Sequence, residues 1–190
     1  MAQHHEFNLG GKLLVAMPGM GDPRFASSVI LICAHSDEGA MGLIVNKPTP
    51  DLSFNGLLDQ LGIPHGEGGR EIRVHFGGPV ERARGFVLHG PDYRHDGATM
   101  EIEGGYGMTA TQEVLTALGR GEGPKSALLA LGYAGWGPGQ LETELARNDW
   151  LTVDASEELV FATDDTRKWS AALRRLGVDP LALSTMAGRA

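Results

Sequence analysis

A glycine-rich stretch followed by polar side chains is the part of the chain that comes closest to a known chemical motif. It spans residues 131–145 and has the sequence LGYAGWGPGQLETEL. A phosphate-binding P-loop has a lysine directly after its last glycine, but here Gln140 follows Gly139. A dinucleotide-binding loop needs its third glycine at the position of Gln140. The stretch therefore matches neither of these phosphate-binding motifs.

The same stretch predicts the start of a helix, and the unpaired amides of a helix start can hold an anion. Glu142 and Glu144 lie in the first turns of that helix and would repel an anion. Two interpretations stay open. The stretch is either a tight strand-to-helix turn fixed by Trp136, or the wall of a cleft that presents Trp136, Gln140 and Glu142 to a ligand.

Histidine and cysteine form no recognisable metal or nucleophile pattern. His35, His75 and His89 lie at or near the ends of predicted strands, but no HxH, HxxxH or Cys–His spacing accompanies them. The single cysteine, Cys33, lies in an apolar run, which is typical of a buried structural thiol. The hydrolase motif GxSxG does not occur. We therefore predict no metal, no cofactor and no catalytic residue, which favours a protein that is not an enzyme.

Charge and hydropathy limit the partners of the protein. The formal net charge is −8, and neighbouring arginines form pairs rather than runs. An acidic surface repels nucleic-acid phosphate, so direct DNA binding is not favoured. The N-terminal residues lack the basic start and apolar core of a signal peptide. No apolar run approaches the roughly 20 residues that span a bilayer. We expect a cytoplasmic protein without a membrane segment.

Strand-like runs dominate the chain, and helices stand between them. Apolar and β-branched residues bounded by glycine, proline or aspartate predict strands. These strands span residues 12–18, 28–35, 42–48, 72–78, 84–90, 99–104, 125–133 and 150–155. Apolar residues at helical spacing, with glycine as the stop, predict helices. These helices span residues 53–61, 110–118 and 165–176, with a short one after residue 154 and one at the end of the glycine-rich stretch.

This order of elements predicts the fold class. Strands that occur in consecutive groups are typical of an α+β protein, here with a mixed, largely antiparallel or barrel-like sheet and about five helices. The nearly continuous apolar run at 125–133 indicates a central, buried strand. Thr109 and Gln112 have the spacing of a capping box before a helix. The chain is expected to form one domain, residues 1–190.

Three stretches, in this order and at this spacing, resemble the YqgE/AlgH family of bacterial proteins. They are GKLLVAMPGMGDPRFASSVILICAHSDEGAMGLIVNKP, FGGPVERARGFVLH and LGYAGWGPGQLETELARNDWL. The resemblance covers nearly the whole chain and implies a cytoplasmic, single-domain α+β protein. It also implies a regulatory role, because the AlgH name comes from a proposed role in regulating alginate production and other genes. No catalytic residue is carried over with the resemblance.

The polar residues and glycines at the signature positions of this family exceed what a core needs, which indicates a shared cleft. The candidate ligand-binding residues are His35, Asn46, Gly77, Gly78, Trp136, Gly139, Gln140 and Glu142. We predict a non-enzymatic regulatory or small-ligand-binding protein that influences gene expression indirectly, with a small molecule or a protein as its partner. Two alternatives stay open. One is an enzyme that uses Glu142 or His35 as acid or base in a polar cleft, and the other is a transcriptional regulator that contacts DNA directly.

Overall fold

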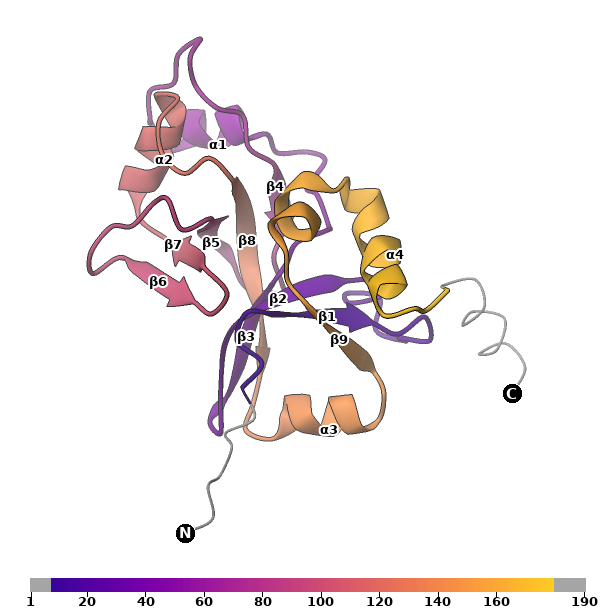
Figure 1. Ribbon diagram of the computed structural model, residues 1–190. Helices are drawn as coiled ribbons and strands as arrows, with labels where there is room; N and C mark the ends of the chain where they lie inside the picture. Colours follow the sequence, from indigo (N-terminus) through magenta and orange to yellow (C-terminus); the bar gives the residue numbers. More distant parts are fainter. Residues whose placement is uncertain (1–7, 180–190) are drawn as a thin grey trace.

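The computed structural model describes residues 8–179, and within them the chain forms nine strands, four α-helices and one π-helix (Figure 1). The strands are β1 (Lys12–Ala16), β2 (Val29–Ser36), β3 (Gly39–Ile44), β4 (Val74–Phe76), β5 (Val80–His89), β6 (Thr99–Ile102), β7 (Tyr106–Thr109), β8 (Ala127–Trp136) and β9 (Trp150–Asp154). The helices are α1 (Phe54–Gln60), α2 (Gln112–Gly119), α3 (Gln140–Ala146), the π-helix η1 (Glu158–Ala162) and α4 (Asp165–Arg175). The first residues of the segment compared with a signal peptide, 1–7, and the end of the predicted domain, 180–190, lie outside the described range. Within that range, no helix combines the length and the apolar character that a membrane crossing requires.

Strand β8 is the spine of a nine-stranded sheet that curls into a half-barrel (Figure 1). The strand order is β6–β7–β5–β8–β3–β2–β1–β9, and β4 pairs with β8 outside this path. The β4–β8 pair is parallel, and the other pairs in the described residues are antiparallel. Residues 127–133 of β8 pair with β5 and β4, whereas its last three residues pair with β3. These findings confirm the predicted α+β class, the mixed sheet and the central strand.

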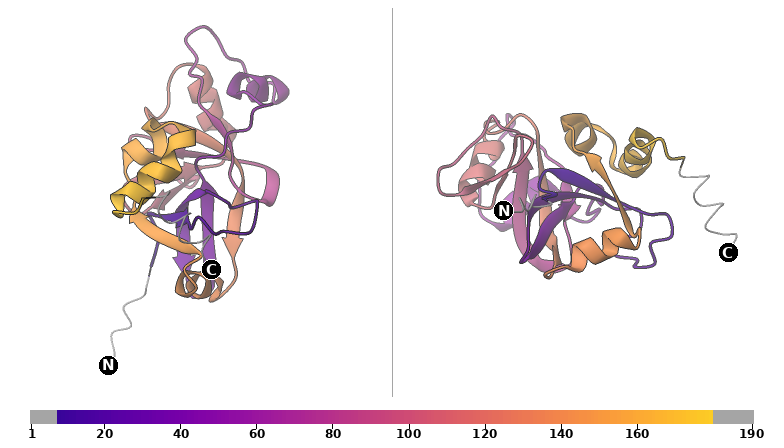
Figure 2. Two further views of the ribbon diagram at one scale, coloured as in Figure 1. Left: turned by 90° about the vertical axis from the view of Figure 1, so that its right-hand side faces the viewer. Right: turned by 60° about the horizontal axis from the view of Figure 1, so that its bottom comes forward.

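Strands β1 to β3 are apolar on both faces because helices cover both faces. Leu13 belongs to a core cluster that includes Leu173 of α4, whereas its neighbour Leu14 belongs to a cluster that includes Leu141 of α3. Figure 2 shows α3 and α4 on opposite sides of these strands. A third cluster lies between helices α1 and α2 and strands β4, β5 and β8. Burial on both faces accounts for the continuous apolar runs in the sequence.

The corner formed by Gly77 and Gly78 packs directly on β8. Gly77 donates its backbone N–H to Leu131 O at 2.8 Å, and its carbonyl accepts the N–H of Ile44 at 2.9 Å. A Cβ atom on Gly78 would lie 2.0 Å from the carbonyl carbon of Tyr133. Glycine is therefore required here because two stretches of backbone are in contact.

The capping box predicted before α2 is wrong, and one strand lies where none was predicted. Strand β7 is preceded by Gly104 and Gly105 and contains Gly107, and glycine weakens the sequence signal of a strand. Thr109 is the last residue of this strand, and its hydroxyl lies 2.8 Å from His89 Nε2 instead of capping the helix. Thr111 occupies the N-cap position of α2 without a side-chain hydrogen bond.

The helices on either side of β9 begin at Gln140 and at Glu158. Asp154 is the last residue of β9 and forms an ion pair with Lys12, so it does not cap the next helix. The π-helix η1 starts at Glu158. Strand β8 continues to Trp136, and α3 starts at Gln140. The strand-to-helix turn of the glycine-rich stretch therefore consists of residues 137–139.

Candidate functional site

A cleft of about 850 Å³ lies between the segment that follows β1 and the segment that joins β8 to β9. Its lining comes from residues 17–25, from the start of β5 and from residues 135–150. The lining residues are Met17, Pro18, Gly19, Met20, Gly21, Asp22, Arg24, Phe25, Pro79, Val80, Gly135, Trp136, Gln140, Glu144, Arg147, Asn148, Asp149 and Trp150. The end of the glycine-rich stretch thus forms one wall of a cleft.

Three aromatic rings and one carboxylate form the base of this cleft. Trp136 packs edge-to-face on Trp150 with 6.2 Å between the ring centroids, and Phe25 packs in the same way on Trp150 at 5.9 Å. Glu144 Oε1 accepts both indole N–H groups, at 3.3 Å from Trp136 and 3.0 Å from Trp150. Both indoles are buried, whereas Phe25 is half-buried. A single carboxylate therefore fixes the orientation of two aromatic side chains.

Two arginine–aspartate pairs lie at the rim of the cleft. Arg24 Nη2 lies 2.8 Å from Asp22 Oδ2, and Arg147 Nη2 lies 2.7 Å from Asp149 Oδ2. The guanidinium carbon of Arg24 also lies 5.5 Å from the centroid of the Phe25 ring. The hydrogen bond from Arg24 lowers the pKa of Asp22. Each arginine is thus oriented by an aspartate of its own loop.

Helix α3 directs its polar side chains to different places. Gln140 Oε1 accepts the backbone N–H of Gly137 at 3.0 Å and so closes the turn before the helix. Gln140 and Glu144 both line the cleft, as expected for residues four positions apart on one helix face. Glu142 lies between them in sequence and points to the other side, where its Oε1 is 2.5 Å from His35 Nε2.

Hydrogen bonds at both ring nitrogens fix the orientation of the His35 side chain. Its Nδ1 accepts the N–H of Leu9 at 3.0 Å. The ring hydrogen therefore lies on Nε2, which donates to Glu142. This hydrogen bond lowers the pKa of Glu142. The pair joins α3 to β2, and the lone pair of Nδ1 is already used by the backbone.

The structure divides the predicted ligand-binding residues between the cleft and the frame of the sheet. Trp136 and Gln140 line the cleft. His35 and Trp136 line a neighbouring cavity of about 760 Å³, which shares Val80 and Gly135 with the cleft. The predicted residues that do not line the cleft are His35, Asn46, Gly77, Gly78, Gly139 and Glu142. The eight predicted residues therefore do not line one shared pocket.

Asn46 and Gly139 have local roles in the backbone. Asn46 Oδ1 accepts the N–H of Val29 at 2.9 Å, and its Nδ2 donates to Ser27 O at 2.9 Å. The Asn46 side chain thus ties the start of β2 to the segment after β3. Gly139 is the N-cap of α3 with a φ of 74°, and its carbonyl accepts the Thr143 hydroxyl at 2.9 Å.

Several residues of the cleft were not predicted as ligand-binding residues. Phe25 and Arg24 come from a loop more than one hundred residues before α3, and a single sequence carries no signal that joins the two. Arg147 and Trp150 follow α3 closely in the sequence. Glu144 was weighed only as a group that repels anions, but it lies four positions after Gln140, and helical spacing places both on one face.

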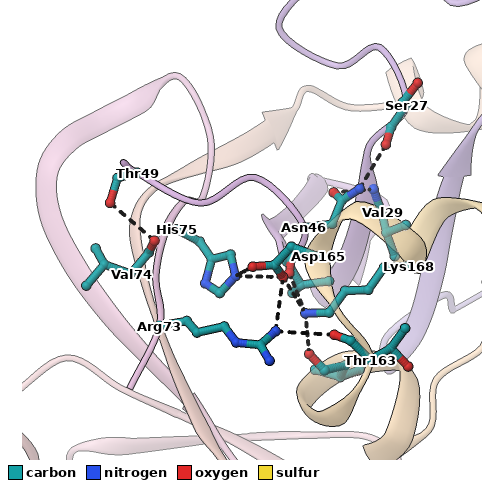
Figure 3. A network of polar contacts seen from close by, with 12 residues as sticks. Ser27, Val29, Asn46, Thr49, Arg73, Val74, His75, Thr163, Asp165 and Lys168 are labelled. Carbon is teal, nitrogen blue, oxygen red and sulfur yellow. Dashed lines mark hydrogen bonds and ion pairs between the residues drawn. The ribbon is translucent and has the colours of Figure 1, made fainter. Parts of the chain in front are cut away.

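A buried ionic network joins α4 to the sheet, away from the cleft (Figure 3). The side chain of Lys168 is 1% exposed. Its ammonium group donates to Val45 O and Val160 O at 2.7 Å each and lies 3.0 Å from Asp165 Oδ1. Three acceptors match the three donors of the ammonium group, so the buried charge is fully hydrogen-bonded.

Asp165 links Lys168 to two further side chains in this network. Both of its carboxylate oxygens lie 3.0 Å from His75 Nε2, and Arg73 Nη1 lies 3.7 Å from Oδ1. Burial acts to raise the pKa of Asp165, but the hydrogen bond from His75 and the charge of Lys168 lower it to about 2. Burial lowers the pKa of Lys168, and Asp165 opposes this shift. The network fastens the first turn of α4 to β4 and to the end of β3.

The geometry of the acidic, histidine and cysteine side chains does not form a metal centre in the described part of the chain. Within residues 8–179, no group of three or more His, Cys, Asp or Glu side chains is placed to hold a metal ion. Burial raises the pKa of the Cys33 thiol to about 12, so this cysteine is not a thiolate at neutral pH.

Comparison with known proteins places this chain beside a set of bacterial relatives. The AlgH-like family model (DUF179) matches residues 13–181. A UPF0301 protein of Cereibacter sphaeroides is 64% identical over 183 residues, which cover 96% of this chain and 100% of the relative. A UPF0301 protein of Paracoccus denitrificans is 55% identical over 185 residues, which cover 96% of this chain and 97% of the relative.

Two solved structures share the fold. The solution structure of the AlgH protein from Pseudomonas aeruginosa matches with a TM-score of 0.77 and 40% identity, and the match covers 100% of this chain and 98% of that one. A crystal structure of a Corynebacterium diphtheriae protein matches with a TM-score of 0.67 and 24% identity, over 92% of this chain and 89% of that one. The second likeness concerns the fold alone. These matches confirm the family resemblance found in the sequence.

Proposed function

The chain belongs to the AlgH-like family, and from this premise we propose that it is a non-enzymatic protein that binds a small organic ligand in the cleft beside α3. Its effect on gene expression is indirect, because the ligand acts through contacts with a protein partner. The observation that carries this proposal is the base of the cleft, where Glu144 holds Trp136 and Trp150 in one orientation.

The shape and lining of the cleft support ligand binding. A volume of about 850 Å³ lies in the range of small-molecule sites. Such sites combine an apolar or aromatic lining with a few fixed polar groups. Here the aromatic rings are packed against one another, and the rim arginines are held by aspartates. A ligand would therefore enter a site whose side chains are already oriented, which lowers the entropic cost of binding.

The hydrogen bonding of the best acid–base candidates supports binding without catalysis. A general base needs a lone pair within reach of the proton that it removes. The Nδ1 lone pair of His35 accepts the Leu9 N–H, and its Nε2 donates to Glu142. Glu142 points away from the cleft lining. Glu144 accepts two indole N–H groups and serves to position aromatic rings.

The charge distribution supports an indirect effect on gene expression. The net charge of −8 opposes association with nucleic acid. The guanidinium carbons of Arg82 and Arg84 lie over the rings of Phe76 and Phe86, at 5.5 and 5.0 Å from their centroids. Arg84 also lies 3.6 Å from Glu81. These arginines are engaged within the chain, which favours a protein partner over DNA.

Tryptophan fluorescence tests the proposal. Trp136 and Trp150 report on the cleft, and Trp169→Phe removes the third tryptophan, whose indole N–H is donated to Ala16 O. In that background, a chemically diverse set of small compounds is titrated. We expect a saturable change in fluorescence with at least one compound. The affinity for that compound should be at least tenfold weaker in Phe25→Ala.

The control for this test is an aromatic residue outside the cleft lining. Tyr93→Ala removes a half-buried ring that packs on His89, so its affinity should equal that of the background variant. If no compound gives a saturable change, and ligand-observed NMR detects no binding, the proposal is wrong. If Tyr93→Ala weakens binding as strongly as Phe25→Ala, the cleft is not the site.

A further inference from the structure

The aromatic rings and the charges of the cleft select one class of small ligand. We infer that the ligand is an organic cation, an alkylated ammonium or guanidinium group on an apolar body, bound against the Phe25 ring and next to Glu144. This inference rests on the proposed function, because it names the ligand class of the same cleft.

The aromatic lining is the first argument for a cation. The faces of Trp and Phe rings carry negative potential, and clusters of such rings recognise quaternary and alkylated ammonium groups. Phe25, Trp136 and Trp150 all line the cleft and pack on one another at 5.9 and 6.2 Å. The chain already contains one example of this contact in the cleft, because the Arg24 guanidinium lies 5.5 Å from the Phe25 ring centroid.

The balance of charge is the second argument. Three carboxylates and two arginines line the cleft. Each arginine is paired with an aspartate two residues away, Arg24 with Asp22 and Arg147 with Asp149. Glu144 is different, because it forms no ion pair within residues 8–179 and its partners are the uncharged indole N–H groups. One negative charge of the cleft is therefore not balanced by a side-chain cation.

The charge of Glu144 lies next to the aromatic rings. Its Oε1 lies 3.0 Å from the indole nitrogen of Trp150 and 3.3 Å from that of Trp136, so the charge lies at the edges of the same rings. A cation beside these rings would gain both the attraction of the half-buried Phe25 ring and that of the half-buried Glu144 carboxylate. A carboxylate or phosphate ligand would meet Glu144 without an unpaired arginine to offset it. The net charge of −8 also attracts cations to the molecule.

The experiment compares compounds of matched shape and different charge. Choline carries a quaternary ammonium group, 3,3-dimethylbutan-1-ol has the same shape without charge, and benzoate is a planar anion. Each is titrated into Trp169→Phe, with the fluorescence of Trp136 and Trp150 and saturation-transfer NMR as readouts. We expect saturable binding of choline, and at least tenfold weaker binding of the alcohol and of benzoate.

Glu144→Gln isolates the role of the charge. Glutamine keeps a side-chain oxygen that can accept the indole N–H groups but removes the negative charge. We expect choline binding to weaken about tenfold and binding of the neutral alcohol to stay within twofold. Glu103→Gln, at an exposed carboxylate that does not line the cleft, is the control and should leave both affinities unchanged. Near-ultraviolet circular dichroism of the two indoles checks that their packing is retained.

The outcomes separate this inference from the proposed function. If the alcohol or benzoate binds as tightly as choline, or if Glu144→Gln leaves choline binding unchanged, the cleft binds small molecules but the cation assignment is wrong. If none of the three probes binds but neutral or anionic compounds of the diverse set do, the cation assignment is again wrong and the proposed function stands. If no compound of any charge binds, both are refuted.

Discussion

Replacing Asp165 with asparagine removes the carboxylate that faces Lys168 and His75 in the buried network. The side chain of Asp165 is 10% exposed, and that of Lys168 is 1% exposed, so solvent screens this charge pair weakly. The pKa of Asp165 is lowered from 3.8 to about 2. At 1.36 kcal/mol per pKa unit, this shift corresponds to about 2.4 kcal/mol of native-state stability at neutral pH. Because Asp165→Asn also leaves a buried ammonium group without its counter-ion, we expect a loss of about 2–4 kcal/mol at pH 7.

The sign of the pH dependence follows from the direction of the shift. A carboxyl group whose pKa is lower in the folded state stabilises the fold above its unfolded pKa of 3.8, and this contribution is lost as pH falls through the folded value of about 2. The wild-type protein should therefore lose about 2 kcal/mol between pH 5 and pH 2 that Asp165→Asn does not lose. The difference between the two proteins should shrink over that interval.

Urea unfolding at pH 7, 5, 4, 3 and 2, followed by far-ultraviolet circular dichroism, measures this difference. The control is Asp154→Asn, which breaks the exposed ion pair with Lys12 and should give no resolvable change, because both side chains are open to solvent. A difference between wild type and Asp165→Asn that stays constant from pH 5 to pH 2 would refute the assigned role of Asp165. A loss at pH 7 no larger than that of the control would do the same.

Three further predictions concern the frame of the sheet and the link between β2 and α3. Gly78→Ala should lower the free energy of unfolding in urea by more than about 3 kcal/mol, because its Cβ would lie 2.0 Å from the Tyr133 backbone. Gly139→Ala has open space around it and should lower this free energy by about 1–2 kcal/mol. Equal losses would contradict the role assigned to the Gly78 contact. Glu142→Ala breaks the hydrogen bond to His35 and should speed hydrogen exchange of the α3 amides about tenfold, and unchanged exchange would show that the pair does not hold the helix. Burial lowers the pKa of His89, so its NMR titration should have a midpoint below 6.5. The stability that the neutral His89 side chain contributes should fall as the pH drops below 6.5. A midpoint above 6.5 would reverse the predicted dependence of stability on pH.

The elements of this fold were predictable from the sequence where one local signal decides them. Ser53 was predicted at the start of a helix and is the N-cap of α1, where its hydroxyl accepts the Gly56 N–H. The apolar run at 125–133 was predicted as a central strand, and β8 occupies the centre because both of its faces are covered. Strand β7 was missed because its glycines weaken the local strand signal. Pairing with β5 and β6 stabilises the strand in the folded protein.

The buried network was not predictable beyond the Asp165–Lys168 pair, which has helical i, i+3 spacing, because the other main partners are distant in sequence. Lys168 lies on the helix predicted over residues 165–176, and a lysine beside the apolar face of a helix is usually exposed to solvent. Its burial depends on the carbonyl of Val45, which is 123 positions away. No spacing rule within one sequence connects these two residues.

The candidate site was predictable in part, and helical geometry explains the part that failed. Trp136 and Gln140 were selected and do line the cleft, but Glu142 was selected with them in place of Glu144. Residues 140 and 144 are one turn apart and share a face, whereas residue 142 lies on the opposite side. Periodicity applied to the seven residues of α3 would have made this choice. The contribution of Phe25 and Arg24 depends on the tertiary arrangement of two loops.

Two glutamates of α3 connect the cleft with β2, which suggests how ligand binding affects residues outside the cleft. Glu144 faces the ligand side through two indoles, and Glu142, two residues earlier, fastens the same helix to His35 on β2. We expect α3, a helix of seven residues, to move as a unit, so that a ligand that displaces Glu144 would also strain the Glu142–His35 hydrogen bond. That bond in turn fixes the ring whose Nδ1 accepts the N–H of Leu9. The segment before β1 is therefore the first place outside the cleft where ligand binding should be felt. Faster hydrogen exchange of the Leu9 amide in the ligand-bound protein would support this route, and unchanged exchange would exclude it.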